Sequence, residues 1–239
     1  MPLTTPAKLD GTRYASYGAR YEGREVQELI RAAGGRGDFI ETVPEMLGIW
    51  GDLLAGKADS TWVFMGWEGV EAARKGVELN VFTLSEAGIP YGYSPLLVAD
   101  PTRLDAQVTR SFLDATSRGF QWAAAHPGEA AALFCQLASA ENPDMPVPLD
   151  VDMCAQSMRY LVDHKALLDD QGMWGRMQTE RWQAYVDWLH AKGLLTSAAP
   201  SRSPDGVSTV SLDDLRAGKA GQLLSPLDVA PLFTNAYLP

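Results

Sequence analysis

The pattern of apolar and polar positions in the first hundred residues alternates between short apolar runs and helical stripes. Residues 14–17 form a predicted strand end, and the stripe that follows has the spacing of an amphipathic helix: Val26, Leu29, Ile30 and Ala33. Further strands are predicted over residues 39–43, 62–65, 77–82 and 96–99, and helices over residues 46–55 and 68–75. Alternation of strand and helix predicts an α/β fold with a parallel or mixed sheet.

From residue 100 onward the pattern predicts helices almost throughout. Asp100-Pro101 is typical of a helix start, an acidic N-cap followed by proline. The next stripe has spacings of three and four and consists of Leu104, Val108, Phe112, Ala115, Gly119 and Trp122. Further helices are predicted over residues 127–140, 151–168 and 182–192, a loop over 196–209 and an apolar docked tail over 224–239. No strand is predicted after these helices, so their apolar faces need another surface to cover.

Composition excludes several classes of protein. The chain has 239 residues, of which 46% are apolar and 21% charged, so it can bury a sizeable core. No run of eighteen apolar residues predicts a transmembrane segment. The net charge of −10 opposes binding to nucleic acid or to anionic lipid.

The two cysteines and the first residues bear on the compartment. Cys135 and Cys154 lie in apolar, helix-like surroundings, which predicts buried free thiols, with a bridge or a reactive thiol as the alternative. The opening Met-Pro-Leu-Thr-Thr-Pro has neither the basic nor the apolar region of a secretory signal. The chain as written is therefore expected in the cytoplasm.

One candidate ligand contact is the turn between the first strand and the first helix. Ser16, Tyr17 and Gly18 lie there, and Gly18 allows a close backbone approach. The start of the next helix would offer N–H groups to a polar ligand atom. No phosphate-binding glycine motif accompanies the turn, so an ordinary strand–helix turn is the alternative.

Two further stretches carry aromatic candidates. Trp67 and Glu68 follow the predicted strand 62–65, where Trp67 could stack on a ring and Glu68 could accept from an amino group. The alternative makes Trp67 a core residue and Glu68 an acid in the first turn of a helix. Tyr91 and Tyr93 lie in a turn-rich loop, residues 88–95, that suits a flat ligand. The three histidines are scattered without ligand spacing, so no metal and no cofactor is predicted.

These stretches, in this order, resemble a known family. Residues 6–18, Pro-Ala-Lys-Leu-Asp-Gly-Thr-Arg-Tyr-Ala-Ser-Tyr-Gly, resemble the opening of the second lobe in type II periplasmic binding proteins. Residues 232–238, Leu-Phe-Thr-Asn-Ala-Tyr-Leu, resemble the Phe-Thr-Asn-Glu-Tyr-Leu ending of one branch. That branch contains the binding proteins for the thiamine pyrimidine precursor and the fungal thiamine pyrimidine synthase. Residues 67–69 and 88–95 are similar to the same branch.

The resemblance implies two α/β lobes that close on a ligand held between them. Residues 9–98 would form the second, ligand-binding lobe, and residues 99–239 the helical return region of the first lobe with the C-terminal tail. The opening strands of the first lobe are expected to be missing, which would explain helices without strands. The implied partners are a small heteroaromatic ligand and, for a full-length protein, the permease of an ABC importer; the implied location is then periplasmic or membrane-anchored outside the cytoplasm.

Within this family the expected function is binding. The expected ligand is a thiamine pyrimidine precursor of the hydroxymethylpyrimidine or formylaminopyrimidine type, contacted by Ser16, Tyr17, Gly18, Trp67, Glu68, Tyr91 and Tyr93. An enzyme resembling the fungal synthase is one alternative, but the Cys-Cys-Cys-Phe-Cys cluster of that enzyme is matched here by residues 91–95, which contain no cysteine. A binding protein for another ligand, such as riboflavin or a sulfonate, is the second alternative.

Overall fold

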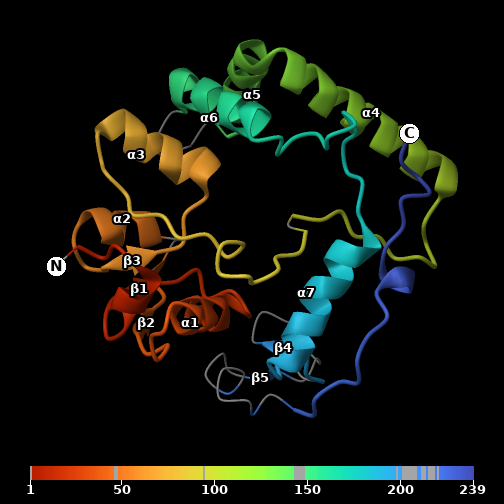
Figure 1. The fold of residues 1–239 in the computed structure, drawn as a ribbon. Helices are drawn as coiled ribbons and strands as arrows, with labels where there is room; N and C mark the ends of the chain where they lie inside the picture. The colour runs from red at the N-terminus through yellow and green to blue at the C-terminus, as the bar shows by residue number, and fades with distance from the viewer. Residues whose placement is uncertain are drawn as a thin grey trace. The chain divides into compact units, whose positions relative to one another are not determined.

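The computed structural model describes residues 2–45, 48–93, 95–142, 149–197, 199–200, 209–210, 214, 219 and 221–239. The chain divides into two compact units built from discontinuous segments (Figure 1). The first unit comprises Met1–Trp62, Asn80–Ser94 and Gln178–Leu232, and the second comprises Val63–Leu79, Pro95–Met177 and Phe233–Pro239. The lobes predicted over residues 9–98 and 99–239 stay a prediction.

The first unit contains a small parallel sheet, which confirms the predicted α/β class. Its strands are β1 (Arg13–Ala15), β2 (Ile40–Thr42) and β3 (Ser60–Thr61), in the order β2-β1-β3. Residues 13, 14 and 15 pair with residues 40, 41 and 42, and residues 14 and 15 pair with residues 60 and 61. Helix α1 (Glu22–Ala32) joins β1 to β2, and α2 (Ile49–Leu54) lies between β2 and β3. The predicted helix over residues 46–55 is thus confirmed from Ile49, and residues 46 and 47 lie outside the described residues.

The two helices cover opposite faces of the sheet. Tyr14 packs with Val26 and Ile30 of α1, whereas the next residue, Ala15, packs with Ile49 of α2. Successive side chains of a strand point to opposite faces, so α1 and α2 lie on different sides. Of the first helical stripe of the sequence, Val26, Leu29 and Ile30 are buried as predicted, whereas Ala33 is the exposed C-cap residue of α1.

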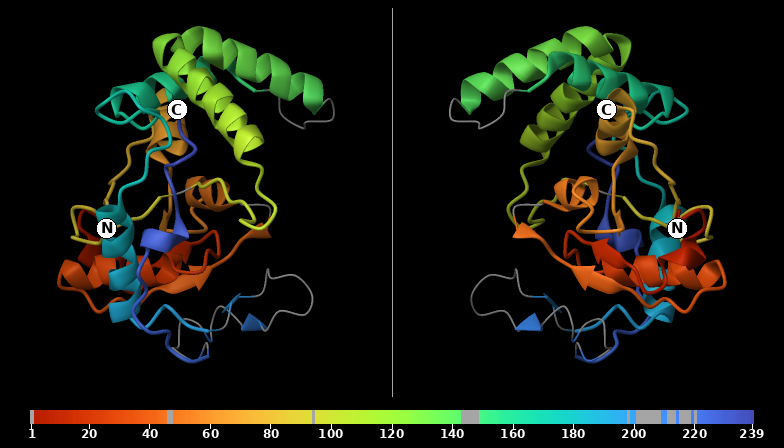
Figure 2. Two further views of the ribbon diagram at one scale, coloured as in Figure 1. Left: turned by 90° about the vertical axis from the view of Figure 1, so that its right-hand side faces the viewer. Right: turned by 90° about the vertical axis from the view of Figure 1, so that its left-hand side faces the viewer.

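The remaining elements are mostly helical. The second unit contains the π-helix η3 (Met65–Gly69), α3 (Val70–Lys75), α4 (Ala106–Ala125), α5 (Pro127–Glu141) and α6 (Val151–Asp163). The first unit adds η1 (Pro6–Leu9), α7 (Thr179–Ala191), β4 (Ala199–Pro200), β5 (Thr209–Val210) and η4 (Ala230–Leu232). In Figures 1 and 2, α5 and α6 lie side by side, and they pack through a shared core.

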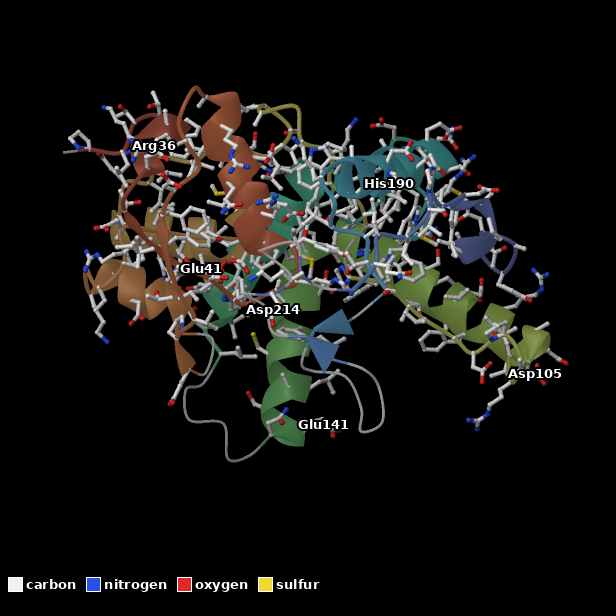
Figure 3. The ribbon with its side chains drawn as sticks, turned by 90° about the horizontal axis from the view of Figure 1, so that it is seen from below. Arg36, Glu41, Asp105, Glu141, His190 and Asp214 are labelled. Carbon is white, nitrogen blue, oxygen red and sulfur yellow. The ribbon has the colours of Figure 1, made fainter. Side chains whose placement is uncertain are left out.

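Short polar side chains and one proline determine where the long helices begin. The Asp105 carboxylate accepts from the N–H groups of Gln107 and Val108 and so caps α4. Asp150 caps α6 in the same way. Pro127 ends α4 and begins α5, as the sequence predicts. Figure 3 shows Asp105 and Glu141 near the outer ends of α4 and α5.

Several predicted elements are wrong. Residues 62–65 are not a strand: β3 ends at Thr61, and Phe64 is 56% exposed, so the apolar run is not covered on both faces. A short apolar run does not by itself distinguish a strand from other structure. Residues 77–82 and 96–99 have no regular secondary structure and pair with no strand among the described residues. The side chain of Val98 is 90% exposed.

The helix predicted from Asp100 begins later. Asp100 accepts from the N–H and the hydroxyl of Thr102, which closes a local turn and leaves capping of the helix to Asp105. The predicted helix over residues 151–168 ends at Asp163. The predicted loop over residues 196–209 includes the two-residue strand β4, and residues 198 and 201–208 lie outside the described residues.

The apolar stripes of α4 and α5 remain exposed. The large exposed side chains on these helices are Val108, Phe112, Phe120, Trp122, Leu133, Phe134 and Leu137. Patches of this kind mark interaction surfaces. No helix of the described residues is long and apolar enough to cross a lipid bilayer.

The apolar tail packs on both units, as the sequence predicts. Val229 is fully buried, and its N–H donates to Gln183 of α7 in the first unit. In the second unit, Asn235 accepts from the N–H of Met177 at 3.0 Å and donates to its carbonyl at 2.7 Å. The Asn235 amide therefore satisfies both backbone polar groups of Met177.

Replacement of Asn235 by alanine is expected to lower the free energy of unfolding by about 1–3 kcal/mol. The substitution leaves the partly buried N–H and carbonyl of Met177 without this partner. Urea unfolding followed by circular dichroism measures the change. Asn235→Asp keeps the acceptor and loses the donor, so its free energy of unfolding should lie between those of Asn235→Ala and the wild type. Equal stability of all three proteins contradicts this assignment.

Candidate functional site

The strand order of the first unit defines where a ligand would bind. In the order β2-β1-β3, the chain passes from β1 to β2 on one side of β1 through α1, and then from β2 to β3 on the other side of β1 through α2, over the opposite face of the sheet. Ligands of open α/β sheets bind outside the carboxyl ends of the strands at such a switch point. Here these ends carry the turn Ser16–Tyr17–Gly18 after β1 and Trp62 after β3.

The turn after β1 is held by its own side chains. Ser16 is fully buried, and its Oγ accepts from the N–H of Gly18 at 2.9 Å. The buried carboxylate of Glu22 accepts from the N–H groups of Tyr17 at 3.2 Å and Ala19 at 3.4 Å. Gly18 has φ of +70°, which favours glycine. The N–H groups of Tyr17, Gly18 and Ala19 are thus engaged within the chain.

Two buried carboxylates of α1 are each bound by a tyrosine. The hydroxyl of Tyr14 donates to Glu22 Oε1 at 2.6 Å, and the hydroxyl of Tyr185, on α7, donates to Glu25 Oε1 at 2.6 Å. Burial raises the pKa of Glu25; the bond from Tyr185 opposes this shift and the charge of Glu22 adds to it. Burial and the charge of Glu25 in turn raise the pKa of Tyr185, so its hydroxyl remains a donor at neutral pH.

Tyr185 also connects α1 to the loop that carries Tyr91. The ring centroid of Tyr91 lies 5.8 Å from that of Tyr185 and 5.9 Å from that of Trp62. Gly92 is close to the same ring, since a Cβ there would lie 3.0 Å from Tyr185 Cδ1. Tyr91 itself is 39% exposed. The three aromatic residues form a continuous strip between α7 and the carboxyl end of β3.

Tyr93 anchors the start of α7. Its hydroxyl oxygen accepts from the N–H of Gln178 at 2.9 Å. The guanidinium of Arg181 lies 4.7 Å from its ring centroid, and the ring of Trp182 lies 6.1 Å away. Arg181 Nε also donates to the carbonyl of Tyr91 at 3.3 Å. One helix therefore positions both predicted tyrosines.

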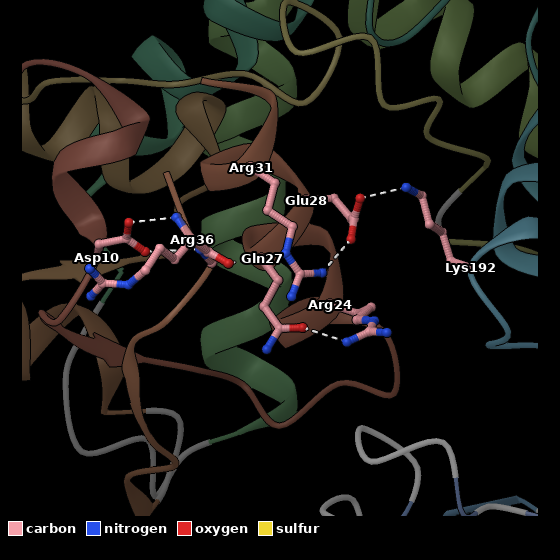
Figure 4. Close-up of polar contacts among 8 residues, drawn as sticks. Asp10, Arg24, Gln27, Glu28, Arg31, Arg36 and Lys192 are labelled. Carbon is pink, nitrogen blue, oxygen red and sulfur yellow. Dashed lines mark hydrogen bonds and ion pairs between the residues drawn. The ribbon is translucent and has the colours of Figure 1, made fainter. Parts of the chain in front are cut away.

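Ion pairs attach the C-terminal end of α7 to α1. Lys192, the C-cap residue of α7, lies 2.5 Å from Glu28 Oε2, and the other oxygen of Glu28 lies 2.8 Å from Arg31 (Figure 4). These contacts lower the pKa of Glu28 against the opposing effect of its burial. Together with Tyr185 and Glu25, they hold the aromatic strip beside α1.

The other two predicted residues, Trp67 and Glu68, lie on η3 in the second unit. Trp67 is 39% exposed. The Glu68 carboxylate accepts from the N–H of Phe64 at 2.9 Å, the local role expected of an acid in a first helical turn. Ser157 Oγ of α6 donates to the carbonyl of Gly66 at 2.5 Å and fixes η3 on α6.

Sequence reasoning missed four residues of this arrangement: Trp62, Glu22, Glu25 and Tyr185. Trp62 is the first residue of the strand predicted over residues 62–65, whereas in the structure it follows the carboxyl end of β3. Glu22 and Glu25 resemble ordinary first-turn acids, and only their burial distinguishes them. Tyr185 lies within the helix predicted over residues 182–192, and the sequence holds no signal that it contacts α1.

The aromatic strip beside the carboxyl end of β3 is the candidate site for a small ligand. Among the described residues, no group of three or more His, Cys, Asp or Glu could hold a metal ion. The family model described as "NMT1/THI5 like" matches residues 1–130, more than half of the chain. The chain belongs to the NMT1/THI5-like family, which includes both thiamine pyrimidine precursor binding proteins and synthases. A comparison with curated proteins finds no match.

Proposed function

We propose that this protein binds a thiamine pyrimidine precursor as the substrate-binding component of an ABC importer. The observation that carries the proposal is the partly exposed ring of Tyr91 in an aromatic strip at the switch point of the sheet. Family membership supports a ligand of the hydroxymethylpyrimidine or formylaminopyrimidine type. The proposed location is periplasmic, or membrane-anchored outside the cytoplasm.

The aromatic strip suits a planar ligand because Tyr91 is held before a ligand arrives. Trp62 and Tyr185 contact its ring, and Arg181 binds its carbonyl. A preorganised ring loses little conformational freedom on binding, and stacked aromatic pairs are favourable by about 0.5–1.5 kcal/mol beyond the area they bury. Ser16, Tyr17 and Gly18 are proposed to contact the ligand from the turn after β1.

The absence of cysteine at residues 91–95 supports binding rather than synthesis. The synthases that this chain resembles carry a cysteine cluster in the matching stretch. Trp67 and Glu68 are proposed as separate ligand contacts, with Trp67 stacking and Glu68 accepting from an amino group. Glu68 would do this in addition to its bond with the N–H of Phe64.

Titration of the purified protein with hydroxymethylpyrimidine and formylaminopyrimidine, followed by calorimetry, tests the function. We expect saturable binding of one of them, weakened at least about tenfold by Tyr91→Ala, which corresponds to about 1.4 kcal/mol. The matched control is Phe112→Ala, which removes an exposed aromatic ring of α4 in the second unit. Glu68→Gln should weaken binding by a similar factor, whereas Glu71→Gln, on the neighbouring helix α3, should not.

The remaining outcomes separate the other hypotheses. Saturable binding of riboflavin or of an alkanesulfonate, without pyrimidine binding, would show that the protein is a binding protein for a different ligand. An aldimine absorbance band after addition of pyridoxal phosphate, with turnover, would show that the protein is a synthase rather than a binding protein. Unchanged affinity of Tyr91→Ala or Glu68→Gln removes that residue from the site.

A further inference from the structure

Two cysteines meet in the core of the second unit, outside the aromatic strip and the turn that lie in the first unit. Cys135 of α5 and Cys154 of α6 are 4% and 5% exposed, and their Sγ atoms lie 3.0 Å apart. Ala131 and Ala155 pack around them, and Leu149 lies against the same cluster. Small side chains at this position allow the two helices to approach closely.

We propose that Cys135 and Cys154 are the site of an intrachain disulfide that joins α5 to α6, formed by exchange with a small organic disulfide. A disulfide places its sulfur atoms about 2.05 Å apart, so the pair must close by roughly 1 Å. The proposal does not depend on the proposed function, because neither cysteine is among the proposed ligand contacts.

The exchange proceeds in two balanced steps. The thiolate of one cysteine attacks the small disulfide, forms a mixed disulfide and releases one small thiolate. The second cysteine thiolate attacks the protein sulfur of that mixed disulfide, which closes the cystine and releases the second small thiolate. The two protons lost by the cysteines protonate the released thiolates, and the two cysteines are oxidised as the small disulfide is reduced.

The packed helices determine when this exchange occurs. Burial, with the neighbouring Cys135, raises the pKa of Cys154 to about 12, so this thiol keeps its proton at neutral pH. The thiolate is the reactive form, and neither sulfur is accessible to a reagent while α5 and α6 are packed. Exchange therefore takes place while the two helices assemble or transiently separate, and the packed helices favour the closed cystine.

The test compares the same redox equilibrium in the folded and unfolded chain. The purified protein is equilibrated with mixtures of oxidised and reduced glutathione, in native buffer and in concentrated urea, and then unfolded and alkylated for mass spectrometry. The disulfide would close a loop from residue 135 to residue 154, and the folded chain has this loop closed already. We therefore expect the folded chain to form the cystine at a lower ratio of the oxidised glutathione concentration to the square of the reduced glutathione concentration than the unfolded chain, by a factor of roughly 100. Oxidised protein should also melt at a higher temperature than reduced protein.

Single-cysteine variants identify the bridge. Cys135→Ser and Cys154→Ser should each form only a mixed disulfide with glutathione, and their melting temperature should not rise on oxidation. The wild-type equilibrium remains decisive if a variant fails to fold. Oxidation as easy in urea as in native buffer, or mixed disulfides and intermolecular dimers alone, overturns the proposal.

Discussion

Replacement of Glu22 by alanine is expected to lower the free energy of unfolding by about 3–5 kcal/mol, the largest single effect predicted outside the apolar core. The buried Glu22 carboxylate accepts from the hydroxyl of Tyr14 and from the N–H groups of Tyr17 and Ala19. Alanine leaves these donors without that acceptor and leaves a cavity beside Tyr14, which is 3% exposed. The turn that carries Ser16 to Gly18 should lose its fixed conformation.

Urea unfolding measures this loss, and pyrimidine titration of the variant measures its effect on the proposed site. Glu22→Gln should lower the free energy of unfolding by less than Glu22→Ala. The amide oxygen of glutamine still accepts a hydrogen bond, whereas its amide nitrogen meets donors from which it cannot accept. Gln27→Ala serves as a control on the same helix and should cost less than about 1 kcal/mol, since it removes one partly buried contact with Arg24. A Glu22→Ala variant as stable as this control contradicts the assigned role.

Replacement of Tyr185 by phenylalanine is expected to cost about 2 kcal/mol at neutral pH, and less in acid. The variant keeps the ring beside Tyr91 and removes only the hydroxyl that donates to Glu25. The buried Glu25 carboxylate then loses that donor. Since burial already raises the pKa of Glu25 and the Tyr185 bond opposes this shift, loss of the bond raises that pKa further.

The pH dependence follows from the direction of this shift. With a raised pKa, folded Glu25 holds a proton that the unfolded chain releases, so the free energy of unfolding falls as pH rises from the ordinary glutamate pKa of 4.5 through the raised value. In Tyr185→Phe this fall extends to higher pH. Below the ordinary pKa, Glu25 is protonated in both states and the cost of the substitution shrinks.

A double-mutant cycle isolates the Tyr185–Glu25 contact. Thermal melts at pH 4 and pH 7.5 should show that Glu25→Gln removes the pH-dependent part of the Tyr185→Phe effect. Tyr237→Phe, in the second unit, is the matched control and should show no such dependence, since the charged group beside the Tyr237 ring is the guanidinium of Arg110 rather than a carboxylate. If Tyr185→Phe destabilises the protein that retains Glu25 by the same amount at both pH values, the hydroxyl does not act through the carboxylate.

Local chemistry made much of the fold predictable from the sequence. The stripe of Val26, Leu29 and Ile30 forms the buried face of α1, and Pro127 separates α4 from α5, because apolar spacing and proline act over a few residues. The predicted strands over residues 77–82 and 96–99 failed for the opposite reason. A strand requires a partner, and the alternation of Val77 to Phe82 does not say whether a neighbouring strand exists.

The candidate site was predictable only in part. The turn of Ser16 to Gly18 could be placed at the carboxyl end of β1, because a small-residue turn between a strand and a helix has a recognisable local pattern. The sequence could not show that Glu22 would satisfy the N–H groups of that turn. Trp67 and Glu68, predicted together with Tyr91 and Tyr93, lie in the other compact unit, and their contact with the same ligand stays a prediction.

The sequence by itself determined the α/β class, the family resemblance, the main helices and the side chains able to stack on a ring. Only the tertiary structure decided which of them meet: Tyr185 with Glu25 and Tyr91, Trp62 with Tyr91, and Cys135 with Cys154. Helix starts and apolar faces depend on neighbours within a few residues. Burial of a carboxylate, contact between aromatic rings and the approach of two thiols depend instead on segments far apart in the chain, which come together only when the helices pack.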